Sequence, residues 1–206
     1  MDELVARARG LIGPGRAVLG ICGAPGAGKS TLAARLVGAI GAAAVVVPLD
    51  GFHLHDDELE RLGRQDRKGA PDTFDVDGYV ALLRRIAADT GDTVDAPSFD
   101  RDRELALAGA IPVLPSHRLV VTEGNYLLLD RPGWRDVRGL LRECWFLSGD
   151  DGTRLERLVA RHVRHGRTPD EARAWVLRSD EANARLVAPT RDAADLVVDP
   201  AGWMTG

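Results

Sequence analysis

The sequence predicts an α/β fold, a three-layer sandwich in which helices cover both sides of a mostly parallel central sheet. Short apolar runs recur along the chain, which is typical of strands buried on both faces of a parallel sheet. Amphipathic segments separate these runs and supply the crossovers that parallel strands require. With 206 residues, the chain has the size of one domain. We therefore expect a single domain over 1–206 that includes a helical, arginine-rich lid at about residues 150–168.

A glycine-rich loop follows the first predicted strand. The segment Asp2–Ile12 predicts an amphipathic helix, and the apolar run 17–22 predicts the strand. The next residues match the phosphate-binding loop pattern at every defined position, and a helix to about Ile40 follows them. They are Gly23, Ala24, Pro25, Gly26, Ala27, Gly28, Lys29 and Ser30, with Thr31 next in the helix. The chain thus has the signature of a P-loop NTPase.

The chemistry of this loop predicts nucleotide binding. Glycines let successive backbone N–H groups turn toward a phosphate, and the following helix directs its positive dipole end at the same point. We expect Lys29 to hold the β- and γ-phosphates and Ser30 to ligate Mg²⁺. The alternative is a glycine-rich turn in an ordinary α/β protein.

Two later apolar runs end on an acid. The run 43–49 leads to Asp50, and the run beginning at Leu119 leads to Glu123. Because ligands of open parallel sheets lie at the carboxyl ends of the strands, Asp50 is expected opposite Lys29 as a catalytic residue. Glu123 is expected to serve Mg²⁺. The alternatives are that Asp50 caps a helix at 56–59 and that Glu123 merely ends an apolar run.

The middle of the chain is harder to interpret. Residues 63–77 predict a polar loop, and Asp77 is expected to cap the helix that follows it. Residues 94–103 are charged and contain a proline, which predicts an irregular segment that lines a pocket. Lys68 is notable because it and Lys29 are the only lysines in the sequence; the alternative is an ordinary surface lysine.

The predicted lid is rich in arginine. Strands are expected at 143–147 and 196–198, with a two-sided helix at 153–165 between them. Four arginines share an arc of roughly 80° on that helix. Because like charges repel, an anion or nearby acidic residues must neutralise the positive charge of these arginines. The functional interpretation is a lid over the transferring phosphates, and the alternative is a solvated face paired with acids. These arginines are Arg154, Arg157, Arg161 and Arg164.

Composition limits the partners. The net charge of −4, without a basic arm or stripe, argues against nucleic acid and anionic membranes. No apolar run approaches membrane-spanning length, and the first residues lack the pattern of a secretory signal. Cys22 and Cys144 lie in predicted strands and suit a reducing compartment. We expect a cytoplasmic protein that binds small molecules; a homodimer stays open.

With these residues in hand, the chain resembles the phosphoribulokinase, uridine kinase and pantothenate kinase family over about residues 17–199. Within it, the chain is most similar to a bacterial branch with mixed uridine kinase-like, pantothenate kinase-like and fructose-transport kinase-like labels. The motifs that carry the resemblance are Gly23 to Ser30, Asp50-Gly51-Phe52-His53, Arg67-Lys68-Gly69 with Phe74-Asp75, Pro97-Ser98-Phe99-Asp100-Arg101, Glu123-Gly124-Asn125-Tyr126, the arginine-rich helix, and Thr190-Arg191 with Ala194-Asp195-Leu196-Val197-Val198.

The resemblance implies roles for individual residues. Asp50 would take the proton of the acceptor hydroxyl, and Glu123 would serve Mg²⁺ or the acceptor. Arg161, together with Arg157 or Arg164, would contact phosphates, and Arg191 would lie near the adenine. The residues implied to surround the acceptor beside Asp50 are His53, Arg67, Lys68, Phe99, Arg101 and Tyr126. Many uridine kinases have a tyrosine at the position of Phe99, which argues against uridine itself.

Together these observations predict an ATP-dependent phosphotransferase, with ATP and Mg²⁺ as cofactors and a hydroxyl of a small metabolite as acceptor. That acceptor would be a nucleoside, a pantothenate-like compound or a sugar. The competing class is a nucleotide-dependent regulatory NTPase, whose hydrolysis a protein partner would stimulate. A nucleotide-binding module without catalysis is disfavoured, because the predicted catalytic residues are all present.

Overall fold

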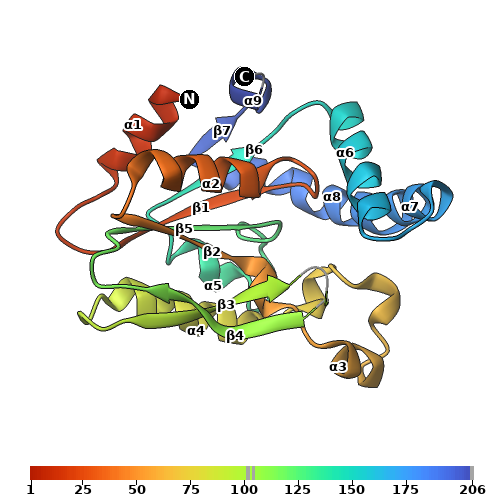
Figure 1. Cartoon of the computed structure of the whole chain (residues 1–206), viewed down its shortest axis with the longest axis horizontal. Coiled ribbons are helices and arrows are strands. Elements are labelled where there is room, and N and C mark those ends of the chain that lie inside the picture. The colour runs from red at the N-terminus through yellow and green to blue at the C-terminus, as the bar shows by residue number, and fades with distance from the viewer. Residues whose placement is uncertain (101–102, 104, 205–206) are drawn as a thin grey trace.

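A parallel sheet forms the middle layer of the structure (Figure 1). The computed structural model describes residues 1–100, 103 and 105–204. Within this part of the chain the sheet has five strands in the order β2-β5-β1-β6-β7, and all neighbouring strands pair in parallel. The strands are β1 (Ala17–Gly23), β2 (Ala44–Pro48), β5 (Leu119–Gly124), β6 (Glu143–Leu147) and β7 (Leu196–Val198). The predicted α/β class and parallel sheet are confirmed.

Helices cover both faces of the sheet, and Figure 1 shows α1 and α2 on one side and α4 and α5 on the other. Short helical turns η1, η2 and η3, together with α3, connect β2 to α4 along the chain. The helices of the described chain are α1 (Asp2–Gly10), α2 (Lys29–Ile40), α3 (Asp56–Arg61), α4 (Val76–Ala88), α5 (Arg135–Arg138), α6 (Asp151–Arg164), α7 (Pro169–Trp175), α8 (Glu181–Val187) and α9 (Ala201–Met204). The turns are η1 (Leu49–Phe52), η2 (Gln65–Arg67), η3 (Pro71–Thr73), the π-helical η4 (Val176–Asp180) and η5 (Ala188–Ala193).

The central strand β1 shows why the sheet needs two helical layers. All of its residues are buried, and its side chains alternate between two separate cores. Val18 and Cys22 pack with residues of α4, such as Leu83, whereas Leu19 and Ile21 pack with α1 and α2. Successive residues of a strand point to opposite faces, so a continuous apolar run is satisfied only when both faces are covered. None of the described helices is long and apolar enough to cross a membrane.

A hairpin stands where the sequence predicted an irregular segment. Residues 94–100 form β3 (Val94–Asp100), which pairs antiparallel with β4 (Leu105–Val113). Val94 and Ala96 are buried while Asp95 is exposed, and the register shifts between Ala96 and Ser98. Pro97 lies at this irregularity, where a missing N–H is tolerated. The prediction of an irregular segment was wrong, because the partner strand comes later in the sequence. The expectation that the segment lines a pocket is confirmed at Phe99.

The cap of α4 also differs from the prediction. The Asp75 carboxylate, not that of Asp77, accepts a hydrogen bond from the backbone N–H of Gly78 at 2.9 Å, and the helix begins at Val76. Asp75 and Asp77 both precede the apolar helical pattern. The pattern alone therefore does not decide which of the two residues caps the helix.

Tyr79 of α4 provides a test of how the helical layer that contains α4 supports the sheet. Thr122 of β5 donates its hydroxyl to the Val47 carbonyl at 2.7 Å and accepts from the buried Tyr79 hydroxyl at 2.6 Å. Burial raises the pKa of Tyr79 well above its ordinary value, so the hydroxyl keeps the proton it donates. We expect Tyr79→Phe to lower the free energy of unfolding by about 1 kcal/mol, measured by urea denaturation. An unchanged midpoint would contradict this role.

Candidate active site

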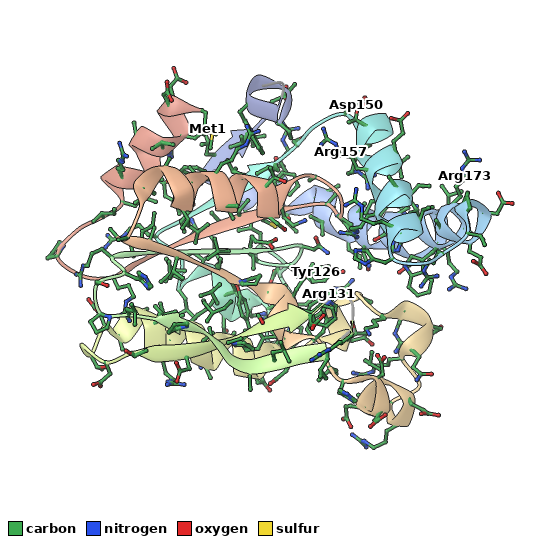
Figure 2. All side chains as sticks on the ribbon, in the orientation of Figure 1. Met1, Tyr126, Arg131, Asp150, Arg157 and Arg173 are labelled. Carbon is green, nitrogen blue, oxygen red and sulfur yellow. The ribbon has the colours of Figure 1, made fainter. Side chains whose placement is uncertain are left out.

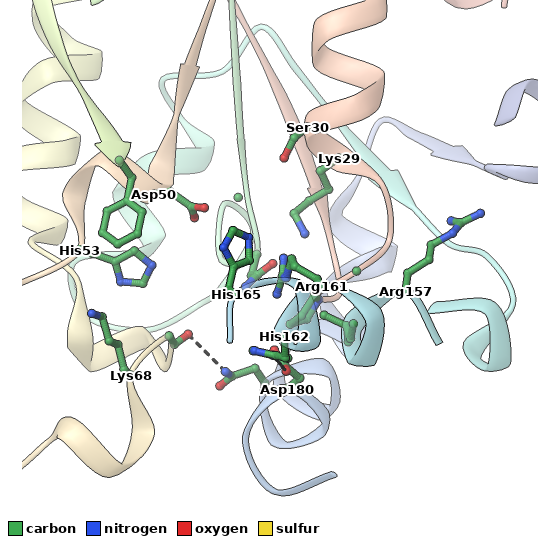
Figure 3. Close-up of a pocket in the computed structure, with 18 of the residues that line it drawn as sticks. Lys29, Ser30, Asp50, His53, Lys68, Arg157, Arg161, His162, His165 and Asp180 are labelled. Carbon is green, nitrogen blue, oxygen red and sulfur yellow. Dashed lines mark hydrogen bonds and ion pairs between the residues drawn. The ribbon is translucent and has the colours of Figure 1, made fainter. Parts of the chain in front are cut away.

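A cavity of about 940 Å³ opens at the carboxyl ends of β1, β2 and β5 (Figure 3). Its lining includes phosphate-loop residues, Asp50 and Glu123 from strand ends, and side chains of α6. Figure 3 shows Asp50, His53 and Lys68 on one side of the space and Lys29, Arg161 and His165 on the other. The parallel sheet brings Asp50, Glu123 and the phosphate loop together because β1, β2 and β5 point the same way.

The phosphate loop has the conformation that its glycines allow. Gly26 and Gly28 have φ values of +78° and +97°, in the left-handed region that favours glycine. Lys29 opens α2 and is buried, and its Nζ donates to the carbonyls of Gly23 and Ala24 at 3.0 Å each. Burial lowers the pKa of the Lys29 ammonium, while the carboxylates of Glu123 and Asp50 act in the opposite direction.

Ser30 and Glu123 meet beside the loop. The Ser30 hydroxyl donates to Oε1 of Glu123 at 2.9 Å, and Glu123 is buried at the end of β5, the strand paired with β1. A hydroxyl and a carboxylate are hard oxygen donors that suit Mg²⁺. No group of three or more His, Cys, Asp or Glu residues in the described chain could hold a metal. Two protein oxygens therefore fit a Mg²⁺ site of the kind that substrate phosphates and water complete.

Asp50 lines the cavity from the short turn η1 at the end of β2. The structure excludes the alternative that it caps the next helix. His55 occupies that position, and its Nδ1 accepts from the backbone N–H of Asp57 at 3.4 Å. Gly51 keeps this turn close to the hairpin, since a Cβ there would lie 2.6 Å from the Pro97 carbonyl oxygen.

Aromatic rings form the wall beside Asp50. His53 stacks on Phe74 at 4.1 Å between ring centroids and lies 5.0 Å from the Phe99 ring. The Lys68 ammonium is 5.9 Å from the centroid of Phe99 and pairs with Asp56 at 2.7 Å. All five residues line the cavity. This wall thus offers both apolar faces and charged groups.

Three residues implied by the resemblance are not in the described cavity lining. Arg67 forms ion pairs with Asp66 and Asp72. Tyr126 is fully buried, and its hydroxyl donates to the Gly69 carbonyl at 2.6 Å. Arg101 lies outside the described residues.

The arginine face of α6 divides in two. Arg157, Arg161 and Arg164 line the cavity. Arg154 is instead buried and pairs with Asp151 and Glu181. Arg161 contributes to the lowered pKa of Lys29, which marks its proximity to the loop. The alternative of pairing with nearby acids therefore applies to Arg154.

The sequence interpretation missed several cavity residues after the phosphate loop. His162 lies 2.9 Å from the buried Asp180 at the end of η4, and both line the cavity. Asn183 donates to the Gly69 carbonyl at 3.2 Å, and Trp175 and His165 complete this side. Polar residues inside an otherwise helical apolar pattern were the available signal, but periodicity alone gives them no role.

A second cavity of about 520 Å³ lies on the other side of the loop. Ala24 and Arg191 line it, together with residues that follow β6 such as Ser148. Arg157 borders both cavities, and in Figure 3 its side chain points away from Asp50.

Comparison with known proteins agrees with this geometry. The profile of the Phosphoribulokinase / Uridine kinase family matches residues 18–203. The chain belongs to this family. A Schizosaccharomyces pombe protein named "Putative uridine kinase C227.14" is 34% identical over 96% of this chain and 89% of the relative. A Lactococcus lactis pantothenate kinase is 26% identical over 89% of this chain and 68% of the relative.

Structural similarity extends over nearly the whole chain. The crystal structure described as a "putative fructose transport system kinase" from Silicibacter sp. TM1040 is 41% identical, with a TM-score of 0.85. The match covers 95% of this chain and 98% of that chain. This member of the phosphoribulokinase/uridine kinase family is a small-molecule kinase with a phosphate-loop fold.

Proposed function

We propose that this kinase transfers the γ-phosphate of ATP to a hydroxyl group of a small metabolite. One observation carries the proposal: Lys29, the Ser30–Glu123 pair and Asp50 line one cavity at the ends of three adjacent strands. Phosphoryl transfer needs positioning and charge neutralisation more than covalent help from the protein. Groups for the donor and for the acceptor are thus within one cavity.

The phosphate side of the cavity is cationic. The loop N–H groups and Lys29 would bind the β- and γ-phosphates. Ser30 and Glu123 would hold Mg²⁺, which neutralises charge on the phosphates when bound. The second cavity, with Arg191 and the outer side of Arg157, is the proposed site of the nucleoside part of ATP.

The acceptor side contains the base. Asp50 would accept the proton of the acceptor hydroxyl and orient its oxygen toward the γ-phosphate. His53, Lys68 and Phe99 would form the wall against which the rest of the acceptor binds.

Residues about 150–168 are the proposed lid of a single kinase domain. Closing α6 over the cavity would bring Arg161 to the phosphates and exclude water, which limits wasteful hydrolysis of ATP. Arg164, the last residue of α6, lines the same cavity.

The names of the similar proteins differ in the acceptor that they suggest. They are a putative uridine kinase, a pantothenate kinase and a putative fructose transport system kinase. The proposed acceptor class is therefore a nucleoside, a pantothenate-like compound or a sugar. The decisive experiment measures ATP consumption with nucleosides, pantothenate, pentoses, hexoses and their phosphates. Lys29→Ala protein serves as the matched blank.

We expect at least one compound to stimulate ATP consumption in the unaltered protein and not in the blank. The phosphorylated product should appear in equal amount to ADP. Hydrolysis that no small hydroxyl compound stimulates, but a protein partner does, would contradict the proposal and favour a regulatory NTPase.

A further inference from the structure

Few side chains of helix α6 are buried against the rest of the protein. Only Arg154 and Leu158 among its residues are buried. The other apolar residues of the helix are half-buried, as Leu155 and Val159 are, or exposed, as Val163 is. The orientation of the helix therefore depends strongly on the few contacts of its buried side.

Arg154 makes three separate contacts with its guanidinium group. Nε donates to Oδ1 of Asp151 at 2.9 Å, and one terminal nitrogen donates to Oε1 of Glu181 at 2.5 Å. The other terminal nitrogen donates to the Pro25 carbonyl of the phosphate loop at 3.3 Å. The side chain is 7% exposed, so these bonds form largely away from water. One residue thus joins α6 to both α8 and the phosphate loop.

The loop and the helix also pack directly. A Cβ on Gly26 would lie 2.7 Å from Cγ of Leu158 and 3.0 Å from the backbone oxygen of Arg154. The glycine is required here twice, because its φ of +78° is also in the left-handed region. The tip of the phosphate loop therefore fits against the two buried residues of α6.

A second contact lies two turns further along α6. His162 pairs with Asp180, which directly precedes Glu181, the partner of Arg154. Arg157 and Arg161 lie between the two contacts. The consecutive acids at the junction of η4 and α8 thus hold both ends of the segment that carries the cavity-lining arginines.

We infer that Arg154 and Glu181 are positioning residues that orient Arg157 and Arg161 toward the phosphates of the bound nucleotide. This inference rests on the proposed function. Arg154 and Glu181 also border the second cavity, but the hydrogen bonds of the Arg154 guanidinium are made to protein groups. We therefore expect its effect on phosphate binding to pass through the orientation of α6.

Helix geometry indicates the size of the effect. Arg161 lies about 10 Å further along the axis than Arg154, at about 1.5 Å per residue. A tilt of about 10° at Arg154 would move Arg161 by roughly 2 Å. Misplacement of about 1 Å can cost about 10²-fold in rate. A small loss of support at Arg154 should therefore weaken contacts with phosphate groups selectively.

The experiment compares the affinities of the full chain for ATP and for AMP by calorimetry with Mg²⁺ present. Arg154→Met keeps an apolar stem without the three hydrogen bonds, and Glu181→Gln keeps the shape without the charge. For each variant we expect ATP affinity to fall further than AMP affinity, so that the ratio of ATP to AMP affinity falls about tenfold. The double variant should lose no more than Arg154→Met alone, because the two residues act together.

Arg173→Met is the matched control, since Arg173 is exposed on α7, borders neither cavity and points outward in Figure 2. It should leave the ratio unchanged. If Arg154→Met does not fold, Glu181→Gln still tests the inference with Arg154 in place. An unchanged ratio in Glu181→Gln, or an equal loss of ATP and AMP affinity, would overturn the positioning role. Failure of the unaltered chain to bind ATP would instead contradict the proposed function.

Discussion

Replacement of Lys29 by alanine is expected to lower kcat by at least about 10²–10³-fold, the range found when one preorganised charge-stabilising group is removed. Lys29 is buried and lies at the first turn of α2, with its ammonium turned back to the loop carbonyls. No other lysine or arginine belongs to the loop itself. Charge that develops on the transferring phosphate would therefore lose its nearest cation.

The measurement is turnover with the acceptor that the ATP-consumption screen identifies. Far-ultraviolet circular dichroism and thermal unfolding would check that the alanine variant folds. Lys29→Arg is the matched variant that keeps the charge; we expect it to remain strongly impaired, because a planar guanidinium does not reproduce a compact ammonium in a tight buried site. Near-normal turnover in Lys29→Ala would contradict the assigned role.

Replacement of Asp50 by asparagine is expected to lower kcat by about 10²–10⁴-fold, the usual contribution of a positioned general base. Asparagine has nearly the same shape and keeps an oxygen toward the cavity, but it cannot take the proton of the acceptor hydroxyl. Asp50 is on the proposed acceptor side of the cavity and is not among the residues that line the second cavity with Arg191. The affinity for ATP should therefore change by less than about threefold.

Stopped-time product assays and ATP titrations would separate these two effects. Asp72→Asn is a matched control, because Asp72 pairs with Arg67 and is not among the residues that line either cavity. It should retain turnover within about twofold. If Asp50→Asn turned over the acceptor at a near-normal rate, the base would have to be sought elsewhere.

Local pattern was enough to predict the phosphate loop and the two acids at strand ends. The glycines of the loop are required by its local backbone conformation. The loop can therefore be recognised from its own residues, without knowledge of contacts with distant parts of the chain. Asp50 and Glu123 were predicted near Lys29 because every strand of a parallel sheet presents its carboxyl end at one edge. The structure has both acids at this edge.

Other features depend on contacts between distant parts of the chain. The pattern at 94–100 did not predict a strand, because its pairing with 105–113 gives the segment its regular structure. Tyr126 lies in a motif shared with the family, yet its hydroxyl supports Gly69 rather than lining the cavity. A motif identifies residue types, but packing decides which of them face the ligand.

By itself the sequence determined the α/β class, the phosphate loop and the edge of the sheet where the candidate active site lies. Only the tertiary structure separated Arg154 from the other arginines of α6. Helical periodicity predicts that these arginines share a face of α6, but it does not predict which groups of the protein contact each arginine. Glu181 and Pro25, which are far from Arg154 in the sequence, decide that its guanidinium is buried against protein. Arg161, two turns later on the same face, borders the cavity.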